Sequence, residues 1–294
     1  MRTIQIGHSP DADDIFMYYA IAFGWVGNSI SFQNQSLDIQ TLNEMALDGI
    51  LDISAISFGV YPLLFQEQCL LRTGISFGEG YGPKLIKKRG ITLKRNFKVA
   101  LSGIHTTNAL LFKIAYPQAK IYYKNFLEIE KAVLSGEVDA GVLIHESILE
   151  YDSTLEVEKE IWDIWNDYNQ EELPLPLGGM CIRRSIPLSL AIECEEILTK
   201  AIQIALKHKK FLSRMLLERN LIRVDAQKLE HYLDLYANNN SLSLSSIQIK
   251  AINTLFKLGY DRGYYPQALE ANDCLIPIEY KQSRINECDN ELGF

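Results

Sequence analysis

The chain lacks paired cysteines and long apolar runs, and both absences exclude certain classes of protein. Five cysteines occur among its 294 residues, an odd number, and no two of them form a Cys-x-x-Cys pair. This usage suits a reducing compartment and predicts neither a disulfide framework nor a zinc site. No apolar run has the length that spans a bilayer, and the first residues lack the apolar core of a secretory signal. We therefore expect a soluble, cytoplasmic protein without a membrane partner.

Positive charge is also scarce. Lys and Arg number 29 against 37 Asp and Glu, which gives a formal net charge of -8. This balance opposes a nucleic-acid partner, because such surfaces neutralise phosphates with basic side chains. A small anionic ligand remains compatible with it, since the N-terminus of a helix binds a carboxylate without net positive charge. The sequence has no P-loop or dinucleotide fingerprint, so we expect no nucleotide cofactor.

Length and periodicity predict an α/β protein with two domains. A chain of 294 residues that is 47% hydrophobic suits two cores better than one. Strands and helices alternate, which is typical of parallel sheets. The expected strands cover residues 3–8, 30–35, 52–58, 98–102, 121–123 and 140–144; the expected helices cover residues 13–24, 38–47, 105–113 and 126–134. Residues 188–258 have a mostly helical period.

An internal repeat indicates two similar lobes. Residues 46–57 align with residues 133–144, with Gly49 on Gly136 and Asp52 on Asp139. Chain crossings are expected near residues 90–98 and in the proline-rich segment at 172–180. These crossings predict a larger discontinuous lobe of residues 1–92 and 178–294, and a smaller inserted lobe of residues 93–177. The layout is that of a two-lobed, periplasmic-binding-protein-like (type II) fold, in which ligands bind in the cleft between the lobes.

Polar residues at strand ends and helix starts are the candidate site residues. His145 follows an apolar strand and suits a general base, although a buried structural histidine fits the pattern equally well. Ser57 occupies the matching strand end in the other lobe. Thr106 and Thr107 begin a helix, where they either bind a carboxylate or only cap the helix. The carboxylates at residues 11–14 lie beside a helix start and are expected to stabilise its dipole, so no metal site is predicted there.

Several short motifs, in this order and spacing, resemble one enzyme family, 1,4-dihydroxy-6-naphthoate synthase. They are Ser9-Pro10, Thr41-Leu-Asn43, Gly82-Pro83, Gly103 with His105-Thr-Thr107, Gly136-Glu-Val, Ile144-His-Glu-Ser147 and Leu173-Pro-Leu-Pro-Leu-Gly178. The family belongs to the futalosine route to menaquinone and has the periplasmic-binding-protein fold, although it acts in the cytoplasm. The resemblance implies that cyclic dehypoxanthine futalosine is split into 1,4-dihydroxy-6-naphthoate and a sugar-derived fragment, without a metal or organic cofactor.

The same resemblance assigns roles to individual residues. His145 is implied to be the proton acceptor. The implied substrate contacts are Ala55, Ile56, Ser57, Thr107 and Asn108, with Asn43 a weaker candidate. The chain departs from the family in one loop: the family often has Cys-Pro-Asn-Asp after the Ser-Pro pair, whereas this chain has Asp11-Ala-Asp-Asp14.

Two other functions remain open. Chorismate dehydratase of the same pathway shares the fold, and the segments at 105–107 and 145–147 argue against it. A non-catalytic protein that binds small carboxylates is the second alternative, and the missing export signal argues against that. The oligomeric state is not predicted from the sequence.

Overall fold

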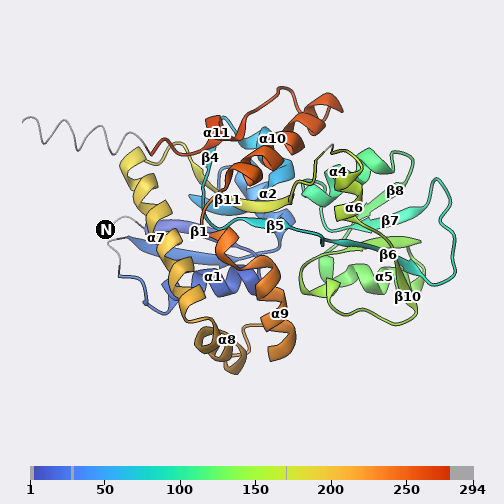
Figure 1. Ribbon diagram of the computed structural model, residues 1–294, viewed down its shortest axis with the longest axis horizontal. Coiled ribbons are helices and arrows are strands. Elements are labelled where there is room, and N and C mark those ends of the chain that lie inside the picture. Colours follow the sequence, from blue (N-terminus) through green and yellow to red (C-terminus); the bar gives the residue numbers. More distant parts are fainter. Residues whose placement is uncertain (1–2, 28–29, 170, 279–294) are drawn as a thin grey trace, which may run out of the picture.

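The computed structural model describes residues 3–27, 30–169 and 171–278, and it places two sheets side by side (Figure 1). The six-stranded sheet has the order β2-β1-β3-β11-β4, with β5 paired to β11, and the five-stranded sheet has the order β10-β6-β9-β7-β8. Strands of the first sheet are β1 (Thr3–His8), β2 (Ser31–Ser36), β3 (Ile53–Ser57), β4 (Gln68–Leu70), β5 (Ser76–Gly78) and β11 (Leu175–Arg183). Strands of the second are β6 (Lys84–Lys88), β7 (Lys98–Leu101), β8 (Lys120–Tyr123), β9 (Ala140–Leu143) and β10 (Leu155–Glu160). The predicted two-lobed α/β fold is confirmed.

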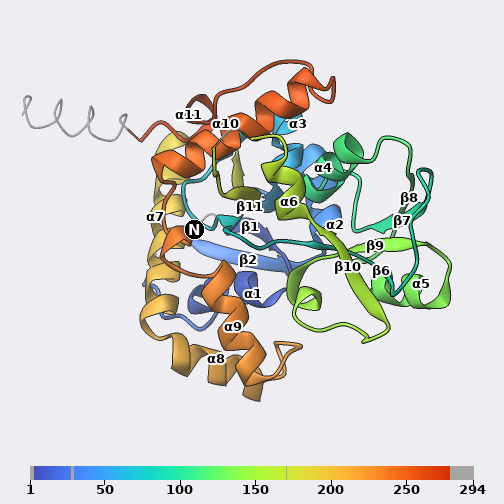
Figure 2. The ribbon, with the colours of Figure 1, turned by 45° about the vertical axis from the view of Figure 1, so that its right-hand side comes forward.

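Helices cover both sheets. The α-helices are α1 (Ala12–Ala22), α2 (Ile39–Leu47), α3 (Tyr61–Leu64), α4 (Thr107–Ala115), α5 (Ile129–Ser135), α6 (Ile161–Asn166), α7 (Leu188–Lys207), α8 (Lys209–Glu218), α9 (Ala226–Tyr236), α10 (Ser246–Asp261) and α11 (Ala271–Cys274). Short 3-10 turns are η1 (Phe58–Val60), η2 (Phe126–Glu128), η3 (His145–Ile148) and η4 (Asn239–Ser241). Figure 2 shows α7, α8 and α9 beside α1 on the six-stranded sheet, and α7 and α9 both contact α1. In the described part of the chain, no helix is long and apolar enough to cross a membrane.

The two lobes repeat one local design, as the sequence alignment predicted. Gly49 and Gly136 follow α2 and α5 with φ angles of 63° and 77°, a left-handed conformation that glycine adopts without strain. Asp52 then accepts a hydrogen bond from the backbone N–H of Gln5 at 3.0 Å. Asp139 does the same for the backbone N–H of Lys98 at 2.7 Å. Each aspartate thus joins the start of its strand to the neighbouring parallel strand, β1 in one lobe and β7 in the other.

The sheets are mixed rather than purely parallel, because the crossing segments are strands. β1 pairs in parallel with β2 and β3, and β7 with β8 and β9. Strand β6 returns antiparallel to β9 in the second sheet, so the chain leaves the first sheet before Lys84. The proline-rich segment expected to be a plain crossing forms β11, which pairs antiparallel with β3. Pro176 lies beside a register shift against β5, where the missing N–H of proline is tolerated.

Candidate active site

A cleft that is partly open to solvent lies where strand ends of both lobes meet. The first lobe contributes Ala55, Ile56 and Ser57 from the end of β3, and the second contributes Ile144 and His145 after β9. The other described residues that line it are Ser9, Asp11, Asp13, Asp14, Met17, Ile39, Gly74, Ser76, Pro83, Thr106, Thr107, Asn108, Leu177, Gly178, Gly179, Tyr232 and Tyr236. Among the described residues of this lining, His145 is the only basic side chain, so an anionic ligand group would depend on N–H and O–H donors for binding.

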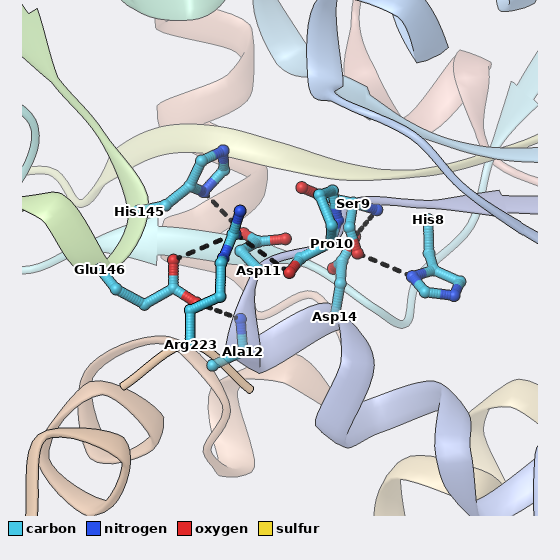
Figure 3. Close-up of polar contacts among 9 residues, drawn as sticks. All are labelled: His8, Ser9, Pro10, Asp11, Ala12, Asp14, His145, Glu146 and Arg223. Atoms are coloured by element: carbon cyan, nitrogen blue, oxygen red, sulfur yellow. Dashed lines mark hydrogen bonds and ion pairs between the residues drawn. The ribbon is translucent and has the colours of Figure 1, made fainter. Parts of the chain in front are cut away.

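The imidazole of His145 is held by a carboxylate from the opposite lobe. Its Nδ1 lies 2.6 Å from Oδ2 of Asp11, which lies in the loop between β1 and α1 (Figure 3). A hydrogen bond from Nδ1–H to a carboxylate leaves the lone pair of neutral imidazole on Nε2. Nε2 is buried and has no hydrogen-bond partner among the described residues. In the neutral ring, Nε2 is therefore the nitrogen that can accept a proton, and it lies buried beside the cleft.

The backbone at His145 is strained in a way that fits this role. Its φ is 53°, a left-handed value that is uncommon for a residue with a side chain. Such conformations persist where surrounding contacts hold them, and they cluster at functional sites. Two such contacts involve the imidazole of His145. Its Nδ1 bonds the Asp11 carboxylate, and its ring packs edge to face against the ring of Phe126, with 5.0 Å between the ring centroids.

Burial and charge act in opposite directions on the pair. Burial of His145 lowers the pKa of its imidazole, but the charge and hydrogen bond of Asp11 together with the charges of Glu146 and Asp14 raise it more, and the net pKa lies above the ordinary value of 6.5. Burial raises the pKa of Asp11, yet the charge of the His145 imidazolium and the hydrogen bond from His145 bring that pKa well below its usual range. Asp11 therefore stays ionised at neutral pH and supports a proton on the imidazole.

A second set of contacts ties the lobes together beside His145. Glu146 accepts a hydrogen bond from the backbone N–H of Ala12 at 2.8 Å and lies 3.7 Å from the guanidinium of Arg223. Arg223 also donates to the carbonyl of Pro10 at 3.1 Å (Figure 3). Its guanidinium packs over the ring of Phe126 at 5.1 Å from the ring centre. The loop that carries Asp11 is thereby fixed against the segment that carries His145.

The N-terminus of α4 forms another wall of the cleft. The Thr106 hydroxyl caps this helix by accepting from the N–H of Ala109 at 3.1 Å. The first N–H groups of the helix have no intrahelical partner, which makes this end suitable for a carboxylate. Asn108 lines the cleft, and its side-chain Oδ1 is buried without a partner among the described residues.

The Thr107 hydroxyl links the two lobes. It donates to the carbonyl of Leu177 and accepts from the N–H of Gly59, both at 2.9 Å. The close approach requires glycine at position 59, because a Cβ there would lie 2.8 Å from Cα of Thr107. Since its single proton is donated to Leu177, the hydroxyl is not free to donate to a carboxylate, and a carboxylate at this end of α4 would be bound by backbone N–H groups.

Asn43 acts on the cleft indirectly. Its side chain accepts from the N–H of Ser57 at 2.9 Å and donates to the Ser57 hydroxyl at 3.2 Å. Asn43 is fully buried and does not line the cleft, whereas Ala55, Ile56 and Ser57 do. Asn43 therefore orients Ser57 rather than facing the ligand space.

Two other histidines lie outside the lining of the cleft. His8 bonds the carbonyl of Ser9 through Nδ1 at 2.7 Å and stacks on Tyr18, so both contacts of its ring are structural. His105 precedes α4, and its backbone N–H bonds the side chain of Gln40. His145 is the histidine that faces the cleft.

Sequence reasoning missed the most important partner of His145. Asp11 was expected to act on the dipole of α1, and it does occupy the N-cap position, but its side chain makes no cap hydrogen bond. It turns to His145 instead. The only signal in the sequence was the departure of this loop from the Cys-Pro-Asn-Asp pattern. Tyr232 and Tyr236 line the cleft from α9, and no motif in the sequence indicated that they belong to the site.

Comparison with known proteins identifies the family. A family model described as menaquinone biosynthesis matches residues 4–261. The chain belongs to this family. Among curated relatives, the 1,4-dihydroxy-6-naphtoate synthase of Thermus thermophilus is 28% identical over 90% of this chain and 96% of that protein. The enzyme of the same name from Streptomyces coelicolor is 27% identical over 90% of this chain and 95% of that protein. The resemblance inferred from the motifs is thus confirmed.

Solved structures confirm the fold. Protein AF1704 from Archaeoglobus fulgidus superposes with a TM-score of 0.83 and 32% identity, covering 89% of this chain and 98% of that one. The alkanesulfonate-binding protein SsuA from Xanthomonas axonopodis pv. citri has a TM-score of 0.68 at 12% identity, covering 93% of this chain and 97% of that one. The second likeness shows only that the family shares the architecture of periplasmic binding proteins.

Proposed function

We propose that the chain is a 1,4-dihydroxy-6-naphthoate synthase, a carbon-carbon lyase that splits cyclic dehypoxanthine futalosine. The observation that carries this proposal is the imidazole of His145 in the lining of the cleft, whose Nδ1 is held by Asp11 while its buried Nε2 has no hydrogen-bond partner among the described residues. A protein that only binds its ligand does not need a base that is oriented by a buried carboxylate. The names of the curated relatives support the same activity.

The cleft offers a suitable environment for such a substrate. Apolar side chains of Met17, Ile56, Ile144 and Leu177 line it and suit a flat ring system. The free N–H groups at the start of α4 suit the carboxylate, and they would hold the substrate in one orientation relative to His145.

In the proposed reaction, Nε2 of His145 accepts a proton from the carbon beside the scissile bond. The electron pair of the broken C–H bond forms a double bond of the ring that becomes aromatic. The electron pair of the broken carbon-carbon bond leaves with the sugar-derived fragment, which takes up a proton. Asp11 stabilises the imidazolium that forms, because its carboxylate already receives the Nδ1 proton. No group beyond the side chains of the cleft enters these steps.

The proposal is tested by incubating the purified protein with cyclic dehypoxanthine futalosine and following products by mass spectrometry. We expect 1,4-dihydroxy-6-naphthoate to accumulate over many turnovers. Chorismate serves as the matched alternative substrate. Dehydration of chorismate without cleavage of the futalosine compound would replace the proposed function with that of the sister enzyme, and binding without turnover of either would indicate a binding protein.

The variant Thr107→Val tests whether the Thr107 hydroxyl only joins the two lobes, through Gly59 and Leu177, or also binds the carboxylate of the substrate. The valine removes both hydrogen bonds of the hydroxyl, and we expect roughly tenfold weaker binding, because two neutral hydrogen bonds contribute about 1–3 kcal/mol. The loss should be equal for 2-naphthoate and for uncharged 2-naphthamide in calorimetric titrations, and Thr107→Ser should retain binding. Weakened binding of the acid alone would mean that the hydroxyl itself contacts the carboxylate.

A further inference from the structure

The loop that carries Asp11 is held by contacts on both sides of this residue. On one side, the backbone N–H of Ala12 donates to Oε1 of Glu146 at 2.8 Å. On the other side, the carbonyl of Pro10 accepts from Nη2 of Arg223 at 3.1 Å. Both partners are side chains from distant parts of the sequence (Figure 3). The backbone at Asp11 is therefore fixed from outside its own loop.

Arg223 connects these two contacts with the segment that carries the base. Its Nη2 lies 3.7 Å from Oε2 of Glu146, the residue directly after His145. Its guanidinium also lies over the ring of Phe126, at 5.1 Å from the ring centre, and the same ring packs edge to face against the imidazole of His145. One side chain thus contacts chain neighbours of both Asp11 and His145.

The two ends of the ion pair between Arg223 and Glu146 differ in burial. The side chain of Glu146 is 7% exposed, whereas that of Arg223 is 38% exposed. A buried carboxylate that loses its counter-charge costs free energy, so the guanidinium stabilises Glu146 in the place where it bonds Ala12. Arg223 is not among the described residues that line the cleft. Its influence on the base therefore passes through Glu146 and the loop of Asp11.

We propose that Arg223 is a positioning residue: by bridging Glu146 and the Pro10 carbonyl, it holds the Asp11 carboxylate against Nδ1 of His145. Arg223 transfers no proton and contacts no reacting atom. Its effect on turnover rests on the proposed function, whereas its effect on the contact between Asp11 and His145 does not.

The imidazole pKa distinguishes this bridge from a simple effect of charge. The charged groups that act on His145 are the carboxylates of Asp11, Asp14 and Glu146, and Arg223 lies against Glu146. Removing only a positive charge would raise the imidazole pKa, because the imidazolium would meet less repulsion. Loosening the Asp11 contact would lower that pKa, because the imidazolium would lose its ion pair. The two explanations therefore predict opposite signs.

The variant Arg223→Met removes the charge and the donors but keeps a long apolar side chain over Phe126. It should lower kcat by roughly 10–100-fold, since a small misplacement of a catalytic group costs about that much. KM should stay near the wild-type value, because Arg223 does not line the cleft. The acid limb of the kcat profile should move to lower pH. A raised KM with unchanged kcat would overturn the proposal.

A double variant tests whether the two side chains act as one bridge. Glu146→Gln keeps an oxygen that can accept from Ala12 but removes the ion pair with Arg223. Combined with Arg223→Met, it should lower kcat by less than the product of the two single effects, because both substitutions break the same contact. Effects that multiply fully would mean that the two residues act independently and would contradict the bridge.

The matched control is Arg214→Met. Arg214 on α8 makes the same kinds of contact, over the ring of Phe211 at 5.7 Å from its centre and 3.9 Å from Glu218, but it does not line the cleft. This variant should keep the wild-type kcat and the wild-type pKa of His145. If Arg223→Met does not fold, Arg223→Gln takes its place with the same expected signs.

NMR titration of the imidazole in the ligand-free proteins decides the question without turnover. We expect the pKa of His145 to fall by about half a unit or more in Arg223→Met. An unchanged or raised pKa in the folded variant would overturn the proposal. A wild type that cleaves no substrate would refute the proposed function alone, because the titration would still show whether Arg223 holds Asp11 against the imidazole.

Discussion

Replacing His145 with glutamine is expected to lower turnover by about 10²–10⁴-fold, the usual contribution of a general base. Glutamine has a similar reach and can still donate to Asp11, but it cannot accept a proton from carbon. Binding of a naphthoate product should change little, so the loss appears in kcat rather than KM. Steady-state kinetics on the purified variant measures both.

The pH dependence of the wild type follows from the raised pKa of His145. The imidazole is a base only when deprotonated, so turnover should fall as pH drops through this pKa, beginning at a higher pH than for free imidazole. The variant should lose this acid limb. His105→Gln, a histidine outside the cleft lining, should keep both rate and profile. Turnover of His145→Gln within a few-fold of wild type would mean that another group is the base.

Asp11→Asn is expected to have an effect of similar size for a different reason. The amide of asparagine can present its NH₂ group to Nδ1, which moves the imidazole proton to Nε2 and removes the lone pair from the cleft. Loss of the orienting carboxylate in a Ser-His-Asp triad lowers kcat by about 10⁴-fold for the same reason, so we expect a fall of about 10²–10⁴-fold here.

The imidazole pKa provides the decisive readout for this variant. The Asp11 carboxylate raises the pKa of His145, so its removal should lower that pKa and shift any residual acid limb to lower pH. Urea unfolding should confirm that the variant remains folded, and Asp139→Asn should leave turnover unchanged. An unchanged imidazole pKa in folded Asp11→Asn would contradict the ion pair seen here.

The sequence by itself determined the two-lobed fold and its repeat and indicated His145 as the candidate base, because each of these leaves a local signal. Period and turn residues mark elements, and Gly49 and Gly136 mark equivalent helix ends since left-handed backbone favours glycine. His145 was identifiable because it follows an apolar strand in a motif that resembles a known family. Even the proline-rich segment was located, although its pairing as β11 depends on strands far away in the chain.

Only the tertiary structure decided which groups act on that base. Ala12 and Glu146 meet across 134 residues of sequence, and the Asp11–His145 pair forms beside them. No periodic pattern in the sequence predicts contacts of this kind, because they form only when the two lobes pack and bring separate strand ends to one cleft. The Thr107 hydroxyl illustrates the same limit: the sequence showed a helix start, whereas packing against Gly59 and Leu177 decided that the hydroxyl joins the lobes.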